Sequence, residues 1–245
     1  MLDRSLLRTG ILALGIALAG LLVGVGFTRG RTADRFVSVK GVSEREVRAD
    51  IAIWPLHMVG ADNDLTEAHA KLTRSIAGVK SFLVRHGIDT SSVELTGFGV
   101  FDAQAQQYGG DRTPANRYLV RQTLLVRSTK PDQVREASQK IGELAAIGVA
   151  VSSGAGGEYG QGSGPTFVFT KLNDLKPAMI AEATARAREA ADQFARDSRS
   201  SIGGIRRANQ GIFEILARDQ APGISQETQI AKIVRVVSTV EYFLD

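Results

Sequence analysis

One helix-forming stretch, residues 176–199, constrains the fold of this 245-residue chain more than any other feature. Asp174 can cap the helix, Pro177 suits its first turn, and glycines 203 and 204 stop it. Its apolar residues recur at steps of three and four, as expected for one stripe along a helix: Ile180, Ala183, Ala187, Ala190, Ala191 and Phe194. Because most of the stripe is alanine, the helix can lie close to a flat partner, and a β-sheet face fits best.

The remaining segments alternate between pairs of strands and single helices. The predicted strands are 36–47, 51–59, 93–101, 117–127, 149–153, 166–170, 206–216 and 232–244, and the other predicted helices are 64–86 and 131–148. The order ββαββαββαββ favours an α+β fold with antiparallel sheets over a doubly wound parallel sheet. We expect two parts: residues 1–35, an N-terminal membrane anchor and linker, and residues 36–245, one α+β domain.

The apolar run at residues 10–27 contains no charged side chain. As a helix it would span about 27 Å at ~1.5 Å per residue, close to the ~30 Å hydrocarbon core of a bilayer. Residues 17–19, Ala-Leu-Ala, resemble the cleavage site of a signal peptide, but the apolar run continues beyond them. Cleavage and retention both stay open, and we favour an uncleaved transmembrane anchor.

The net charge of +4 does not indicate a nucleic-acid partner. Residues 1–35 contain five arginines and two aspartates, which leaves 25 basic and 24 acidic side chains in the rest of the chain. No basic stripe with interleaved aromatic residues is visible, so nucleic-acid binding is not expected. The absence of cysteine excludes a disulfide scaffold and any cysteine-ligated metal site.

The three histidines do not form a metal-binding pattern. His57 falls on a predicted strand, whereas His69 and His86 lie seventeen residues apart on one helix, far from an i,i+4 metal pair. The glycine tract 154–164 lacks the helix that a phosphate-binding loop needs at its end, so we interpret it as a solvated loop. The sequence therefore predicts no metal and no cofactor.

No catalytic constellation is recognised either. The chain has no Gly-x-Ser-x-Gly motif, and Asp50, Asp62 and Asp64 near the ends of the second strand are interpreted as turn and cap residues. Trp54 stands beside Pro55, which favours an edge or a bulge, and we assign it to the core, with a subunit interface as the alternative. The sequence therefore predicts no catalytic residues.

Several segments, taken in order and spacing, resemble the SIMPL-domain (DUF541) family, which includes YggE-like periplasmic proteins. They are VSVKGVSEREVRAD, FLVRHGID, VELTGF, RYLVRQTLLV, GVAVS and ATARAREAADQFA. The resemblance implies an exported protein of the cell envelope. It also implies ring assembly in some members and a loose association with oxidative-stress defence, but no accepted catalytic residues.

We therefore expect a single-pass protein of the bacterial inner membrane, held through residues 10–27, with its C-terminal domain in the periplasm; the alternative is secretion to the periplasm after signal cleavage. It would be non-enzymatic and act as a homo-oligomer or through a protein partner. The alternative is a small-ligand-binding module or an enzyme of unrecognised chemistry. Residues 232–244 would assist assembly if that strand lies at a sheet edge; a central position is the other possibility.

Overall fold

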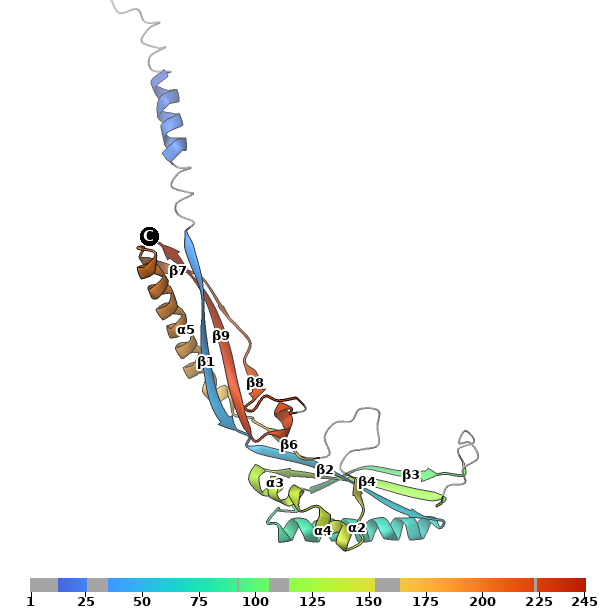
Figure 1. Cartoon of the computed structure of the whole chain (residues 1–245). Coiled ribbons are helices and arrows are strands. Elements are labelled where there is room, and N and C mark those ends of the chain that lie inside the picture. The colour runs from blue at the N-terminus through green and yellow to red at the C-terminus, as the bar shows by residue number, and fades with distance from the viewer. Residues whose placement is uncertain (1–12, 26–34, 92, 106–114, 153–163, 223) are drawn as a thin grey trace, which may run out of the picture. The chain divides into compact units, whose positions relative to one another are not determined.

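The computed structural model describes residues 13–25, 35–91, 93–105, 115–152, 164–222 and 224–245, which form two compact units (Figure 1). Unit 1 comprises Met1–Glu44, Lys176–Glu214 and Arg235–Asp245, and unit 2 comprises Arg45–Leu175 and Ile215–Val234. The α+β fold with two antiparallel sheets is confirmed.

Residues 13–25 are helical and exposed along their whole length. Among the described residues, no helix is both long and apolar enough to cross a membrane. The predicted span 10–27 extends outside the described residues at both ends, and most of the glycine tract 154–164 also lies outside them. Residues 13–25 bury no side chain of their own, so a fragment that begins at residue 35 keeps every buried side chain of the described residues.

In unit 1, one long helix covers one face of a sheet. The sheet has the order β1-β9-β7, and β8, of which only Glu214 belongs to unit 1, also pairs with β9. The bounds are β1 Phe36–Arg48, β7 Ile202–Gln210, β8 Glu214–Ala217, β9 Ala231–Leu244 and α5 Leu172–Asp197. Of the two positions that the sequence leaves open for this strand, the central one is correct, because β9 pairs with β1 on one side and with β7 and β8 on the other.

Helix α5 buries Met179 and then every fourth residue, namely Ala183, Ala187, Ala191 and Ala195. The predicted stripe is correct for Ala183, Ala187 and Ala191, but Phe194 is 49% exposed. The helix also begins four residues before the predicted start. Pro177 therefore lies inside it, where the missing N–H removes a single intrahelical bond near the N-terminus.

Both units bring a helix into close contact with a strand at a glycine. A Cβ on Gly41 of β1 would lie 1.8 Å from the carbonyl oxygen of Ala183, and a Cβ on Gly60 of β2 would lie 2.1 Å from that of Ala68. Neither position has room for a methyl group. The alanine stripe and the glycine together therefore set the distance between helix and sheet.

We expect Gly41→Ala to lower the free energy of unfolding by about 2–3 kcal/mol, because α5 must move away from β1. Urea unfolding of residues 35–245, monitored by circular dichroism, measures this decrease in the free energy of unfolding. The control is Gly204→Ala, where nothing lies within 4 Å of the added Cβ. Equal stability of both variants would show that α5 does not lie as close to β1 as described.

In unit 2, the sheet has the order β3-β4-β2, and the short strands β5 and β6 pair with the other side of β2. The strands are β2 Ile51–Asp62, β3 Val93–Asp102, β4 Tyr118–Ser128, β5 Val151–Ser152 and β6 Thr166–Val168. The helices are α2 Leu65–Arg85, α3 Pro131–Gln139 and α4 Gly142–Ala146, followed late in the chain by the 3₁₀ turn η1 Gln226–Thr228.

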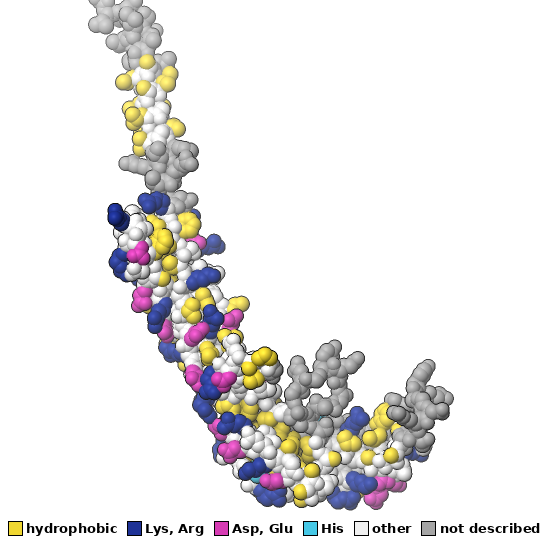
Figure 2. All heavy atoms as spheres, in the orientation of Figure 1, with side chains coloured by type: hydrophobic (Ala, Val, Ile, Leu, Met, Phe, Trp, Pro, Cys, Tyr) yellow, Lys and Arg dark blue, Asp and Glu magenta, His cyan; other side chains and the backbone are white. Residues whose placement is uncertain are grey.

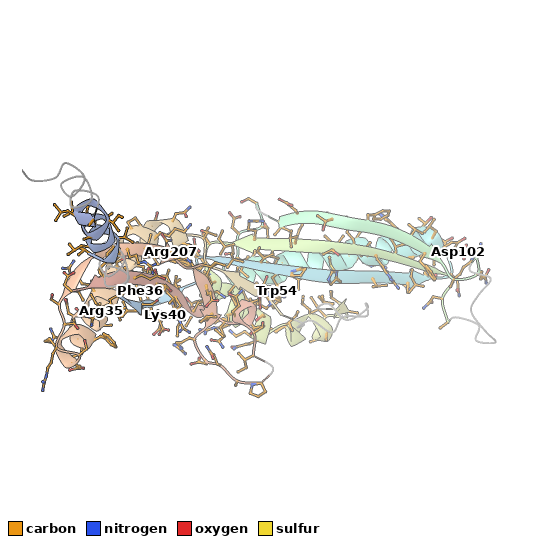
Figure 3. The ribbon with its side chains drawn as sticks, turned by 90° about the horizontal axis from the view of Figure 1, so that it is seen from above. Arg35, Phe36, Lys40, Trp54, Asp102 and Arg207 are labelled. Atoms are coloured by element: carbon orange, nitrogen blue, oxygen red, sulfur yellow. The ribbon has the colours of Figure 1, made fainter. Side chains whose placement is uncertain are left out.

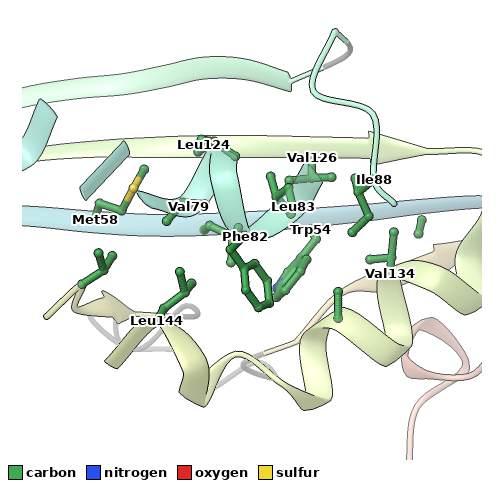
Figure 4. Packing of buried hydrophobic residues seen from close by; sticks show 14 of the residues in the cluster. Trp54, Met58, Val79, Phe82, Leu83, Ile88, Leu124, Val126, Val134 and Leu144 are labelled. Carbon is green, nitrogen blue, oxygen red and sulfur yellow. The ribbon is translucent and has the colours of Figure 1, made fainter. Parts of the chain in front are cut away.

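The core of unit 2 lies between the sheet and its helices (Figure 4). Trp54 is 1% exposed and lies beside Phe82 of α2, so its assignment to the core is confirmed. The expectation of an edge or bulge at Pro55 is wrong, because β2 is central. Pro55 is tolerated since it falls between the pairings of β2 with β6 and with β5, at residues 51–53 and 57–58.

Two predicted elements are divided in the structure. The predicted helix 131–148 breaks after Gln139 and restarts at Gly142, a residue with low helix propensity. The predicted strand 206–216 is divided into β7 and β8. At the break, a Cβ on Gly211 would lie 2.5 Å from the carbonyl oxygen of Val237, and the Gly211 N–H donates to that oxygen.

Candidate interaction surface

Strand β3 is the outer strand of the unit 2 sheet, and its residues 94–100 are all exposed. Helix α2 packs on β2 and β4 instead. The outer strand therefore presents side chains that no described helix covers.

A β-bulge interrupts β3 at its centre. Thr96 pairs with Thr123 and Gly99 pairs with Arg121, so β3 has one more residue than β4 between these two pairs. Gly97 within the bulge has a φ of +62°, a left-handed conformation that glycine adopts at low cost. The extra residue reverses the alternation of side chains in the second half of the strand.

The bulge places apolar side chains from both halves of β3 on one face. Leu95 pairs with Leu124 and Val100 pairs with Val120, and both partners are buried on the face that carries α2. Without the extra residue, positions 95 and 100 would point to opposite faces. Phe98 in the bulge also turns toward α2, where its ring meets the edge of His69 at 6.4 Å between centroids.

These side chains border an open apolar hollow of about 330 Å³, lined by Leu65, Thr66, His69, Phe98, Val100 and Val120. Phe98 is 57% exposed, Val100 49% and Leu95 46%. We define Leu95, Phe98, Val100, Leu65 and His69 as the β3 patch. Figure 2 shows hydrophobic side chains in this part of unit 2 among intermixed basic and acidic ones.

The structure does not bring the three histidines together as a metal site. The His57 ring nitrogen Nδ1 lies 2.8 Å from the Thr123 hydroxyl, and the His86 ring lies 3.2 Å from Glu143. His69 belongs to the β3 patch. No group of three or more potential metal ligands occurs within the residues that the structure describes.

The cap predicted among the three aspartates is confirmed for Asp64, whereas Asp62 and Asp50 each bond another part of the chain. Asp64 caps α2 by accepting hydrogen bonds from the backbone N–H groups of Thr66 and Glu67. Asp62 forms an ion pair with Lys71 at 2.6 Å, and the hydrogen bond from Lys71 lowers the pKa of Asp62. Asp50 lies at the other end of β2, about 40 Å away at ~3.3 Å per residue, so it cannot act as a pair with Asp62 or Asp64.

Asp50 connects the β1–β2 turn to the end of β6. It accepts hydrogen bonds from the N–H of Thr170 at 2.7 Å and from the Thr170 hydroxyl at 2.6 Å. Burial raises the pKa of Asp50, but the hydrogen bonds from Thr170 outweigh it, so the pKa lies below its ordinary value of 3.8.

The stabilisation by Asp50 should depend on pH. Because the folded pKa is lowered, the contribution is present above the unfolded pKa and is lost as the pH falls through the folded pKa. We expect Asp50→Asn to reduce the free energy of unfolding by up to about 1 kcal/mol near pH 7, and the difference to vanish near about pH 2. Urea unfolding at several pH values measures it. Glu189→Gln removes the same charge from an exposed site and should show no such trend.

Residues 37–240 match the model of a family described as SIMPL, a protein of unknown function (DUF541). The chain belongs to the SIMPL family. No curated protein matches this SIMPL chain. It is similar to the crystal structure of an uncharacterized conserved protein from Listeria innocua, with 13% identity over 79% of this chain and 91% of that one and a TM-score of 0.18. A hydrolase from Listeria innocua shares 11% identity over 83% and 92% of the two chains, with a TM-score of 0.17. Likeness at this level carries no argument about function.

Another hollow of this SIMPL chain, about 230 Å³ in volume, is lined in part by three arginines. Each of them already contacts a carboxylate. Arg48 and Arg135 both bond Asp132, and Arg218 bonds Asp219 at 2.8 Å. The charges compensate one another, so the β3 patch is the stronger candidate for an interaction surface.

Sequence reasoning missed the β3 patch. The strand was predicted at 93–101, but the face on which its apolar residues lie depends on the bulge. The available signal was the pair Gly97 and Gly99, because glycine inside a strand commonly marks a bulge.

Proposed function

We propose that this SIMPL protein is a non-enzymatic, membrane-anchored module that binds a second copy of itself through the β3 patch. The observation that carries the proposal is the position of Leu95, Phe98 and Val100. All three are exposed on one face of an edge strand, beside an apolar hollow.

The edge of β3 has a bulge, but no charge or proline protects it against pairing. Edge strands that stay single commonly carry a bulge, a central lysine, a proline or an inward-pointing charge. Between Glu94 and Asp102, β3 has neither a charged residue nor a proline. Another strand can therefore bond to its free backbone groups, while its side chains bury the β3 patch.

A second copy is the proposed occupant because every copy presents the same edge, and a shared membrane anchor raises the local concentration of copies. The polar side chains that line the hollow, Thr66 and His69, do not form an acid–base pair there. Among the described residues that line the hollow, only His69 is titratable, and its ring contacts Phe98. This arrangement supports binding over catalysis.

We expect residues 35–245 to associate at tens of micromolar in sedimentation velocity experiments. The variants Leu95→Glu and Phe98→Glu should weaken association at least about tenfold, because each places a charge in the buried contact. The control is Ile212→Glu, which changes an 84% exposed isoleucine outside the β3 patch. A monomeric wild type, or an equal loss in the control, would contradict the proposal.

A single introduced cysteine can define the geometry, since the chain contains none. The substitution Thr96→Cys puts this cysteine near the centre of β3. A disulfide between two copies would indicate a two-fold contact between β3 strands, whereas association without it would indicate a head-to-tail contact that builds a ring or filament.

The proposed membrane anchor is the apolar run 10–27. In the proposed orientation, the C-terminal domain lies in the periplasm. It is supported by the length of the run and by its continuation past residue 19. A role in envelope or oxidative-stress defence remains a prediction from the family resemblance.

We expect the full chain to stay with the membrane fraction after osmotic shock and to resist extraction by carbonate, because about 18 apolar residues are enough to span the hydrocarbon core. N-terminal sequencing of the mature protein should begin before residue 10. A mature chain that begins at Gly20 and is released by osmotic shock would support secretion instead.

A further inference from the structure

At one end of unit 1, three distant segments of the chain meet (Figure 3). The carbonyl oxygen of Arg35 accepts a hydrogen bond from the Leu244 N–H at 2.9 Å. Ser201 and Asp245 exchange two backbone hydrogen bonds, at 3.2 and 3.0 Å. The start of β1, the end of β9 and the exit from α5 therefore lie together. We define residues 35–40, 196–207 and 241–245 as the Arg35 end.

Basic charge is concentrated at the Arg35 end. It contains six basic and three acidic side chains, whereas the rest of unit 1 from residue 41 onward contains four basic and five acidic ones. The excess is therefore local and is not a property of the whole unit.

Two of the arginines at this end, Arg35 and Arg199, are available to a ligand. Arg35 and Arg199 are exposed, and neither forms an ion pair with another described residue. Arg206 does form one, with Glu241 at 3.5 Å, and its guanidinium lies 4.1 Å from the centre of the Phe36 ring. The ring holds this guanidinium on the open face of the sheet.

Exposed apolar side chains accompany the arginines. Ile205 is 54% exposed, Phe36 41% and Phe243 36%. Arginine with exposed phenylalanine and isoleucine suits the surface of a bilayer, where apolar side chains enter the boundary between headgroups and acyl chains and cations meet anionic lipids.

We infer that the Arg35 end binds the surface of a bilayer that contains anionic lipid headgroups. The inference rests on the proposed anchoring of residues 10–27. Only residues 28–34 separate that run from Arg35, so Arg35 lies within about 28 Å of the end of the span, at ~3.5 Å per residue. The chain is thereby held close enough for the Arg35 end to touch the lipid.

The test uses residues 35–245, which lack the anchor, so lipid binding is separate from membrane insertion. Co-sedimentation compares vesicles of phosphatidylglycerol and phosphatidylcholine with vesicles of phosphatidylcholine alone. We expect binding to the anionic vesicles only, reduced at least about tenfold by Arg35→Glu with Arg199→Glu. The matched control is Arg186→Glu with Arg188→Glu, two exposed residues of α5 outside the Arg35 end, which changes the net charge equally. Absence of binding, or an equal loss in both double variants, would overturn the inference.

A second readout does not depend on charge reversal. An environment-sensitive dye attached at Ser201→Cys should shift its emission to the blue on addition of anionic vesicles, whereas the same dye at Ser81→Cys on α2 should not. Equal shifts at both sites, or none at Ser201→Cys, would overturn the inference. Fractionation of the full chain tests the anchor separately, so failure of one proposal is distinguishable from failure of the other.

Discussion

The close contact between a helix and a sheet at a single glycine is the constraint on which both units depend. The backbone of α5 at Ala183 packs directly against Gly41, and the backbone of α2 at Ala68 packs directly against Gly60. A helix held this close covers a strip about 10 Å wide, which is roughly two strands at ~4.8 Å spacing. In unit 2 those strands are β2 and β4, so the third strand, β3, lies outside the cover. The exposed edge thus follows from the same close packing that builds the core.

Because of its bulge, the uncovered strand β3 presents a defined apolar surface. A regular strand would divide Leu95 and Val100 between the two faces of the sheet, and neither face would gain an apolar patch. One extra residue at Gly97 and Phe98 gathers them on the α2 side. Bulges are common at sheet edges, where they increase the local twist. In β3 the bulge also gathers exposed apolar side chains on one face, and this grouping is the physical reason to connect the β3 patch with association.

The sequence predicts those features that depend on local residues. Asp64 and Gly87 delimit α2 because a cap and a left-handed glycine act within one turn. The place of a strand within its sheet depends on residues far away, and β9 shows this: its many β-formers suit an edge and a centre equally, and the structure places it at the centre. The β3 patch required a register, Leu95 to Leu124 and Val100 to Val120, that no single segment encodes. Charge at the Arg35 end likewise emerges only when three separate segments come together.

The two proposed surfaces lie on different units, but the units are not separate pieces of chain. Unit 1 is assembled from three segments and unit 2 from two, so the chain passes between them within β1, α5 and β9 and just after Glu214. Cutting the chain at any of these points would divide a helix or a strand. Each sheet would then lose a segment that it needs to be complete. Neither unit can therefore be expected to fold alone, since each would lack part of its buried face. Lipid contact and self-association can be separated only by surface substitutions, which leave the shared strands intact.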